Sequence, residues 1–147
     1  IEDRVTFTGL ASEEDWPILH RIPTIYTMPS PNELQSIATL EAMASGKPII
    51  AVDAGALSEL CHDKENGFLV AVDSSDEFKQ SIATILDSLE LLKKFQAESV
   101  AIAKTHDENI VMPQFEALYE AVIEENRQLP RRPRRAFRSV LGGQRQG

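Results

Sequence analysis

The segment from Pro48 to Val52 is apolar at every position. A strand with one face in water alternates apolar and polar residues, whereas a strand of a parallel sheet, covered on both faces, is apolar throughout. Gly46, just before it, is a typical stop for a helix that we expect over about 34–45. The run therefore predicts a buried parallel strand that follows a helix.

Strands and helices are expected to alternate along the rest of the chain. This order is typical of an α/β fold with a parallel sheet covered by helices. Ligands bind such sheets at the carboxyl ends of the strands. The expected strands are 5–8, 24–28, 48–52 and 68–70, and the expected helices begin near 12 or cover about 34–45, 55–60, 74–89, 90–104 and 113–126.

The chain of 147 residues, 42% of them apolar, is long enough for one domain with a core and too short for two. Seven arginines lie between Arg127 and Arg145, where there is no acid, so residues 1–126 carry eight basic and 23 acidic side chains. An acidic body argues against nucleic acid as a partner. We expect a domain over 1–126 and a basic tail over 127–147. The tail is either a disordered linker or a segment attracted to anionic lipid.

The single cysteine, Cys61, excludes an internal disulfide and indicates a reducing compartment. No segment approaches the 18 or more apolar residues of a membrane span. We therefore expect a cytoplasmic protein, which would be peripheral at the inner face of a membrane if the basic tail is the segment attracted to lipid.

Two acidic residues, Glu33 and Glu41, lie eight positions apart where a loop enters the expected helix. Eight helical residues advance about 12 Å and turn by roughly 80° net, so both carboxylates can face one side. Carboxylates accept hydrogen bonds from paired hydroxyls, and the free amides of a helix start favour an anion. The pair therefore suggests a sugar nucleotide, with its hexose and ribose at the two carboxylates and its diphosphate between them.

The motif around these residues is more specific than the pair itself. Pro29-Ser30-x-x-Glu33 is followed after seven residues by Glu41-Ala-Met-Ala-Ser-Gly-x-Pro-Ile-Ile, then by Asp53-Ala-Gly, Glu59-Leu and Asn66-Gly-Phe-Leu-Val. This ordered set resembles the C-terminal domain of retaining glycosyltransferases of the two-domain GT-B architecture, in family 4. The resemblance covers roughly residues 3–126. It implies a Rossmann-like three-layer sandwich with a parallel sheet flanked by helices.

The resemblance also implies an activity and residue roles. The full enzyme would move a hexose from a UDP- or GDP-sugar to a lipid or glycan acceptor, without a metal ion or other cofactor. Glu33 would contact the donor sugar as the catalytic residue, and Glu41 would bind the ribose. Amides from Gln35 to Ile37 would hold the diphosphate. The family's usual Arg and Lys pair and its acceptor domain would lie before Ile1, so we expect a fragment that is inactive alone.

The loop after Glu33 departs from the family pattern, which has glycine near Ser36. The Ser36 hydroxyl either donates to the phosphate or crowds it. Glu-Leu-Gln-Ser is similar to the Glu-Thr-Gln-Gly of diacylglycerol glucosyltransferases, a hint of a lipid acceptor. Gly9 is either a contact to the nucleotide base or a turn glycine, and for Ser30 a local cap is favoured over phosphate contact.

Gly55 can supply a tight turn, and Glu59 is expected to brace the same loop. The loops at Gly9, at 30–33 and at 53–55 are expected to meet at one rim of the sheet. His20 and Arg21 suit the end of a helix as cations. Two other functions remain open. The chain could belong to a nucleotide-sugar epimerase of the same architecture, with His62 as the acid/base candidate, or it could be a non-catalytic binding module.

Overall fold

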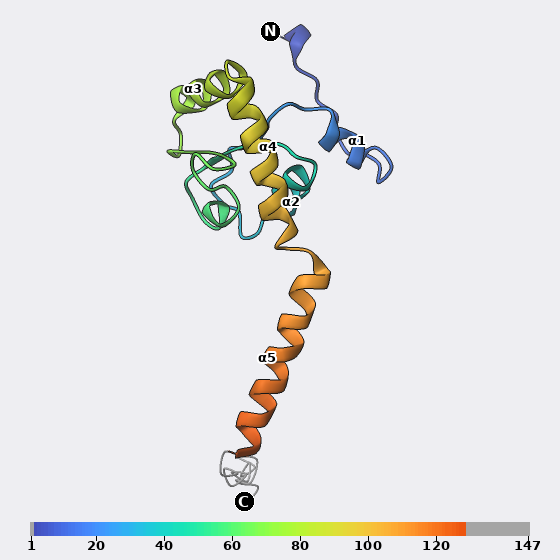
Figure 1. Cartoon of the computed structure of the whole chain (residues 1–147). Coiled ribbons are helices and arrows are strands. Elements are labelled where there is room, and N and C mark those ends of the chain that lie inside the picture. Colours follow the sequence, from blue (N-terminus) through green and yellow to red (C-terminus); the bar gives the residue numbers. More distant parts are fainter. Residues whose placement is uncertain (1, 129–147) are drawn as a thin grey trace, which may run out of the picture. The chain divides into compact units, whose positions relative to one another are not determined.

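The computed structural model describes residues 2–128 of the chain. The chain divides into two compact units, Ile1–Val111 and Met112–Gly147. Of the basic tail expected over 127–147, all but the first two residues lie outside the described part. The sheet and all the candidate site residues belong to the first unit, shown with its helices in Figure 1.

The sheet of the first unit has three parallel strands in the order β1 (Tyr26–Met28), β2 (Ile49–Val52) and β3 (Gly67–Val70). Tyr26 pairs with Ile49, and Ile49 pairs with Gly67 on its other side. All four residues of β2 are buried, as its apolar sequence predicts. The parallel sheet flanked by helices confirms the expected fold class.

Helices α2 (Ile37–Ala44), α3 (Ser75–Leu86) and α4 (Leu89–Lys104) cover the sheet. Helix α4 packs against both α2 and α3 (Figure 1). The shorter elements are η1 (Glu2–Arg4), α1 (Trp16–Arg21) and η2 (Leu57–Glu59). The fully buried large side chains that these elements share in one core include Met43, Ile49, Ile50, Leu57, Ile85 and Phe95.

The prediction of a strand over 5–8 is wrong. No strand forms there, and the Phe7 side chain is 94% exposed. Among the described residues this segment pairs with no other strand, and alternation alone does not form a strand without a neighbour to accept its backbone hydrogen bonds. Gly9 therefore does not follow a strand. The sheet of residues 2–128 has three strands where four were expected.

Two helix boundaries also differ from the expectation. Helix α2 begins at Ile37, three residues later than expected, because the Ser36 side chain caps it. The helix expected over 113–126 is α5 (Glu108–Gln128), which begins before Pro113. The Asp107 carboxylate accepts the backbone N–H of Asn109 at 2.8 Å, which satisfies one of the unpaired amides at this helix start.

The described residues of the second unit, Met112–Gln128, are helical throughout and exposed. Their large apolar side chains recur at helical spacing and include Phe115, Leu118, Tyr119 and Val122, which are between 44% and 64% exposed. Over residues 2–128, no helix combines the length and the apolar character that crossing a bilayer requires.

Candidate functional site

The loop that carries Glu33 lies against the loop after β2. Gly55 has a φ of +56°, and a Cβ at this position would stand 2.5 Å from the backbone oxygen of Glu33. That oxygen also accepts a hydrogen bond from the backbone N–H of Ala56 at 3.4 Å. Only glycine fits here, because the backbone is left-handed and the neighbouring loop leaves no room for a side chain. Two of the three loops expected to meet at one rim do so, whereas the space around Gly9 is open.

The start of α2 has amides without partners. The Ser36 Oγ accepts the backbone N–H of Thr39 at 3.4 Å and the Thr39 hydroxyl at 2.9 Å, and Ser36 is buried. Within residues 2–128, the N–H groups of Ile37 and Ala38 donate to no protein atom. The first turn thus offers two backbone donors to a ligand. The Ser36 hydroxyl is occupied as a cap, so a contact of it with phosphate stays a prediction.

Gln35 and Ser30 both lie in the loop before this helix start. Gln35 is exposed beside the cap. The Ser30 Oγ accepts the backbone N–H of Asn32 at 3.4 Å, which is the local cap favoured by the sequence. The structure therefore holds the residues on both sides of Glu33 by short-range hydrogen bonds.

The Glu41 carboxylate, one turn into α2, is held by two rings of α1. The indole Nε1–H of Trp16 donates to Glu41 Oε2 at 2.7 Å, and His20 Nε2 lies 3.4 Å from the same oxygen. Within residues 2–128 the other oxygen, Oε1, accepts no hydrogen bond. Glu41 is therefore fixed on one oxygen and open on the other.

The Tyr26 phenol is affected by both glutamates. Burial raises its pKa, the negative charges of Glu33 and Glu41 raise it further, and a hydrogen bond with the Thr39 side chain acts in the opposite direction. Both carboxylates are thus close enough to one phenol to act on its charge. That the two glutamates face one side, as their spacing predicts, stays a prediction.

Two cavities adjoin residues that the sequence predicts to bind the donor. A cavity of about 370 Å³ lies between α2 and the end of α4, and Glu41, Lys104 and His106 line it. A second cavity of about 300 Å³ is lined by Gln35, Glu59 and His106 among others. His106 borders both. Glu59, expected as a brace of its loop, is exposed and belongs to the wall of the smaller cavity.

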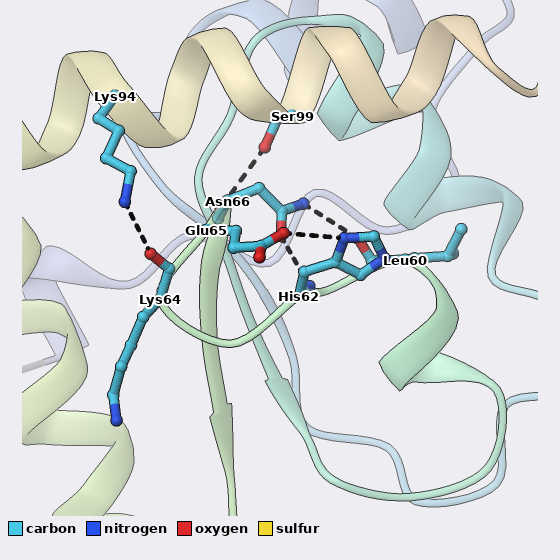
Figure 2. Close-up of polar contacts among 7 residues, drawn as sticks. All are labelled: Leu60, His62, Lys64, Glu65, Asn66, Lys94 and Ser99. Carbon is cyan, nitrogen blue, oxygen red and sulfur yellow. Dashed lines mark hydrogen bonds and ion pairs between the residues drawn. The ribbon is translucent and has the colours of Figure 1, made fainter.

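Asn66 has a structural role that the sequence analysis did not assign. It is fully buried, its Oδ1 accepts the backbone N–H of His62 at 2.8 Å, and its Nδ2 donates to the Leu60 carbonyl at 3.0 Å. Figure 2 shows this side chain between the two ends of the loop before β3. His62 lies 3.3 Å from Glu65 in the same loop. His62 is therefore part of a loop brace, away from the contacts of Glu33 and Glu41 described above.

The sequence analysis also missed the roles of Trp16 and His20. It assigned no role to Trp16 and treated His20 as a cation at a helix end, whereas His20 is only 8% exposed. The available signal was their spacing of four residues, which places two polar-tipped rings on one helix face. Among residues 2–128, no group of three or more His, Cys, Asp or Glu side chains is arranged to hold a metal ion.

The parallel sheet covered by helices matches the Rossmann-like half of the GT-B glycosyltransferase architecture, as the solved structures described below share it. The family model "Glycosyl transferases group 1" matches residues 1–100. The chain belongs to this family. The matched residues include both Glu33 and Glu41.

Several relatives support this assignment. The D-inositol 3-phosphate glycosyltransferase of Corynebacterium glutamicum is 30% identical over 127 residues, which are 86% of this chain and 30% of that protein. The lipopolysaccharide core biosynthesis mannosyltransferase LpcC of Rhizobium leguminosarum is 39% identical over 83 residues, 56% of this chain and 23% of that one. The chain thus spans less than a third of the length of these relatives.

A solved structure resembles the fold and contains a ligand. Anabaena Alr3699/HepE in complex with UDP is 27% identical, with a TM-score of 0.68, and the match covers 87% of this chain and 33% of that one. The C-terminal domain of the Francisella tularensis glycosyl transferase LpcC is 29% identical with a TM-score of 0.62, covering 67% of this chain and 51% of that domain's chain.

Proposed function

We propose that this chain is the donor-binding half of a retaining glycosyltransferase, which moves a hexose from a UDP- or GDP-sugar to a lipid or glycan acceptor. One observation carries the proposal. Glu33, the open amides of Ile37 and Ala38, and Glu41 occur in this order along one helix start and its first turns. The order matches that of sugar, diphosphate and ribose in a donor. The UDP complex of the Anabaena neighbour supports the ligand class.

Each part of this site has a distinct task in the proposed reaction. The Glu41 carboxylate accepts hydrogen bonds from the ribose hydroxyls and so anchors the nucleotide. The amides at the start of α2 face the diphosphate and stabilise the charge that develops on it as the glycosidic bond breaks. Glu33 orients the hexose, which gains positive character at the same moment. The donor is bound in this scheme by protein groups, and no metal ion is assigned a role.

A titration tests donor binding. The 147-residue chain is titrated with UDP, GDP, UDP-glucose and GDP-mannose by calorimetry, with and without EDTA. We expect saturable binding of one of the two nucleotides and of its sugar derivative. The affinity should not change when EDTA is present. No binding of any of the four would overturn the proposal.

Activity assays on the longer protein separate the alternatives. A transferase releases free nucleotide only when acceptor is present, whereas an epimerase converts one nucleotide sugar into another and a non-catalytic module does neither. The 147-residue chain by itself should bind donor without transferring sugar, because half a cleft does not exclude water from the reaction.

We also propose that the arginines of the tail, from Arg127 to Arg145, attract an anionic membrane surface on the cytoplasmic side. Each basic residue near such a surface contributes about 1 kcal/mol. The chain should sediment with phosphatidylserine vesicles and be released by about 0.5 M salt, which shortens the screening length. Equal binding to neutral phosphatidylcholine vesicles, or equal binding after removal of residues 129–147, would contradict this part.

A further inference from the structure

Trp16 and His20 form a unit at the back of the predicted ribose site. They lie one turn apart on α1, and their rings meet edge to face with centroids 5.0 Å apart. Both reach the same atom, Oε2 of Glu41, although Glu41 lies 25 residues further along the chain than Trp16. We call this unit the indole–imidazole clamp.

We propose that the clamp consists of positioning residues, which fix the Glu41 carboxylate so that Oε1 is presented to the hydroxyls of a ribose. The inference rests on the proposed function, because it assumes that Glu41 is the ribose anchor. An indole N–H only donates, so its hydrogen bond sets the direction of the carboxylate without competing for the hydroxyl protons of a ligand. A glutamate side chain fixed in advance loses less rotamer freedom when the ligand binds.

The clamp is itself held in place. His20 is buried, and its ring lies 6.2 Å from that of Tyr26 on β1. The Lys47 Nζ, also largely buried, donates to the Arg21 carbonyl at 2.8 Å and so ties the end of α1 to the turn between α2 and β2. The Glu41 side chain, by contrast, remains 41% exposed. His20 is thus a buried support behind an accessible side chain, while Trp16, 42% exposed, fixes the carboxylate from the more open side. Support of an accessible ligand-binding group by such hydrogen bonds is the arrangement that a positioning role requires.

The test compares two ligands that differ only at the ribose. Trp16→Phe keeps an aromatic ring and removes the N–H. The variant is titrated with UDP and GDP and with their 2′,3′-dideoxy analogues. We expect the affinity for the ribonucleotide that binds to fall about tenfold and the affinity for its dideoxy analogue to stay unchanged. Adding Trp16→Phe to a Glu41→Gln variant should cause no further loss. Ile22→Ala, an exposed position just after α1, is the matched control.

A second readout does not depend on a ligand. Trp16 is the only tryptophan of the chain, so its fluorescence reports on the clamp. Glu41→Gln should shift the Trp16 emission, and Ile22→Ala should not. An unchanged emission in Glu41→Gln would overturn the inference even if Trp16→Phe failed to fold.

The outcomes separate the two proposals. If the wild-type chain binds neither UDP nor GDP, the proposed function fails and the clamp fails with it. If the wild type binds and Trp16→Phe binds equally well, only the positioning role is overturned. An equal loss for the ribonucleotide and its dideoxy analogue would show that Trp16 acts through packing alone, which also overturns the positioning role.

Discussion

The backbone oxygen of Glu33 occupies the space that a Cβ on Gly55 would need, at 2.5 Å. The position of the predicted sugar-binding residue therefore depends on a residue 22 positions later that has no side chain. Backbone atoms cannot move aside as the end of a flexible side chain does, so the contact couples the two loops directly.

Gly55→Ala should displace the Glu33 loop. Gly9 provides the matched control, because it has a similar φ of +63° and open space around a Cβ. Gly9→Ala should lower the free energy of unfolding by about 1 kcal/mol for the left-handed backbone alone. Gly55→Ala should cost about 2–4 kcal/mol and weaken the binding of a nucleotide sugar. Equal costs in urea unfolding would show that the Glu33 carbonyl yields easily.

Glu41→Ala and Glu33→Ala should differ in the intact enzyme. In the proposed donor arrangement Glu41 binds the ribose, which changes little during the reaction, so its loss should weaken nucleotide binding by about 1.5–3 kcal/mol. In the same proposed arrangement Glu33 contacts the sugar, so its loss should lower turnover by roughly 10²-fold with nearly normal binding of free nucleotide. The measurements are a titration with UDP or GDP and steady-state kinetics. The reverse ranking would mean that the donor lies in the opposite direction along α2.

Asn66→Ala should destabilise the first unit strongly. It removes a fully buried amide and leaves the His62 N–H and the Leu60 carbonyl without their hydrogen-bond partner. We expect a loss of about 2–5 kcal/mol in the free energy of unfolding. Asn109→Ala, at an exposed asparagine that bonds Asp107, should cost under about 1 kcal/mol. Similar costs for the two variants in thermal unfolding would contradict the assigned brace.

Cys61 should make the folded state less stable at alkaline pH. Burial chiefly, and the charge of Asp63 secondarily, raise the pKa of the Cys61 thiol from 9.0 to about 12. The unfolded chain releases this proton above about pH 9 while the folded chain keeps it, so the free energy of unfolding should fall as pH rises from about 9 towards 12. The effect amounts to a few kcal/mol at most.

Unfolding titrations at pH 8, 9 and 10 measure this slope, and Cys61→Ala is the control. The variant should lose the part of the slope that the thiol causes. Alkylation by iodoacetamide at pH 8 should also be slow in the folded protein and fast in urea. Rapid labelling of the folded protein would contradict the burial of the thiol.

The parallel sheet was predictable from local sequence, but the contacts around Glu41 were not. The apolar run at β2 and the glycine before it are local signals, and both predictions hold. The bond from Trp16 to Glu41 joins residues 25 positions apart, and nothing in the periodicity of either segment indicates it. The alternation at 5–8 is also local, and it failed because a strand needs a neighbour that the segment itself does not specify.

Ser36 illustrates a second limit. The hydroxyl of a serine at a helix start can bond either the backbone or a ligand, and the sequence does not distinguish the two. Only the distances to Thr39 show that the hydroxyl is used as a cap here. The order of Glu33, helix start and Glu41 follows from the sequence, because Glu33 precedes α2 and Glu41 lies within it, whereas the hydrogen-bond partner of each polar group depends on the packed structure.

The support of Glu33 by backbone atoms has a consequence for how such a site diversifies. Leu34 and Ile37, on either side of the cap, are 93% and 67% exposed, so their side chains contribute little to the core. The fold should therefore tolerate substitutions at these two positions. If the donor binds as proposed, single changes here would alter donor preference without a need for compensating stability elsewhere.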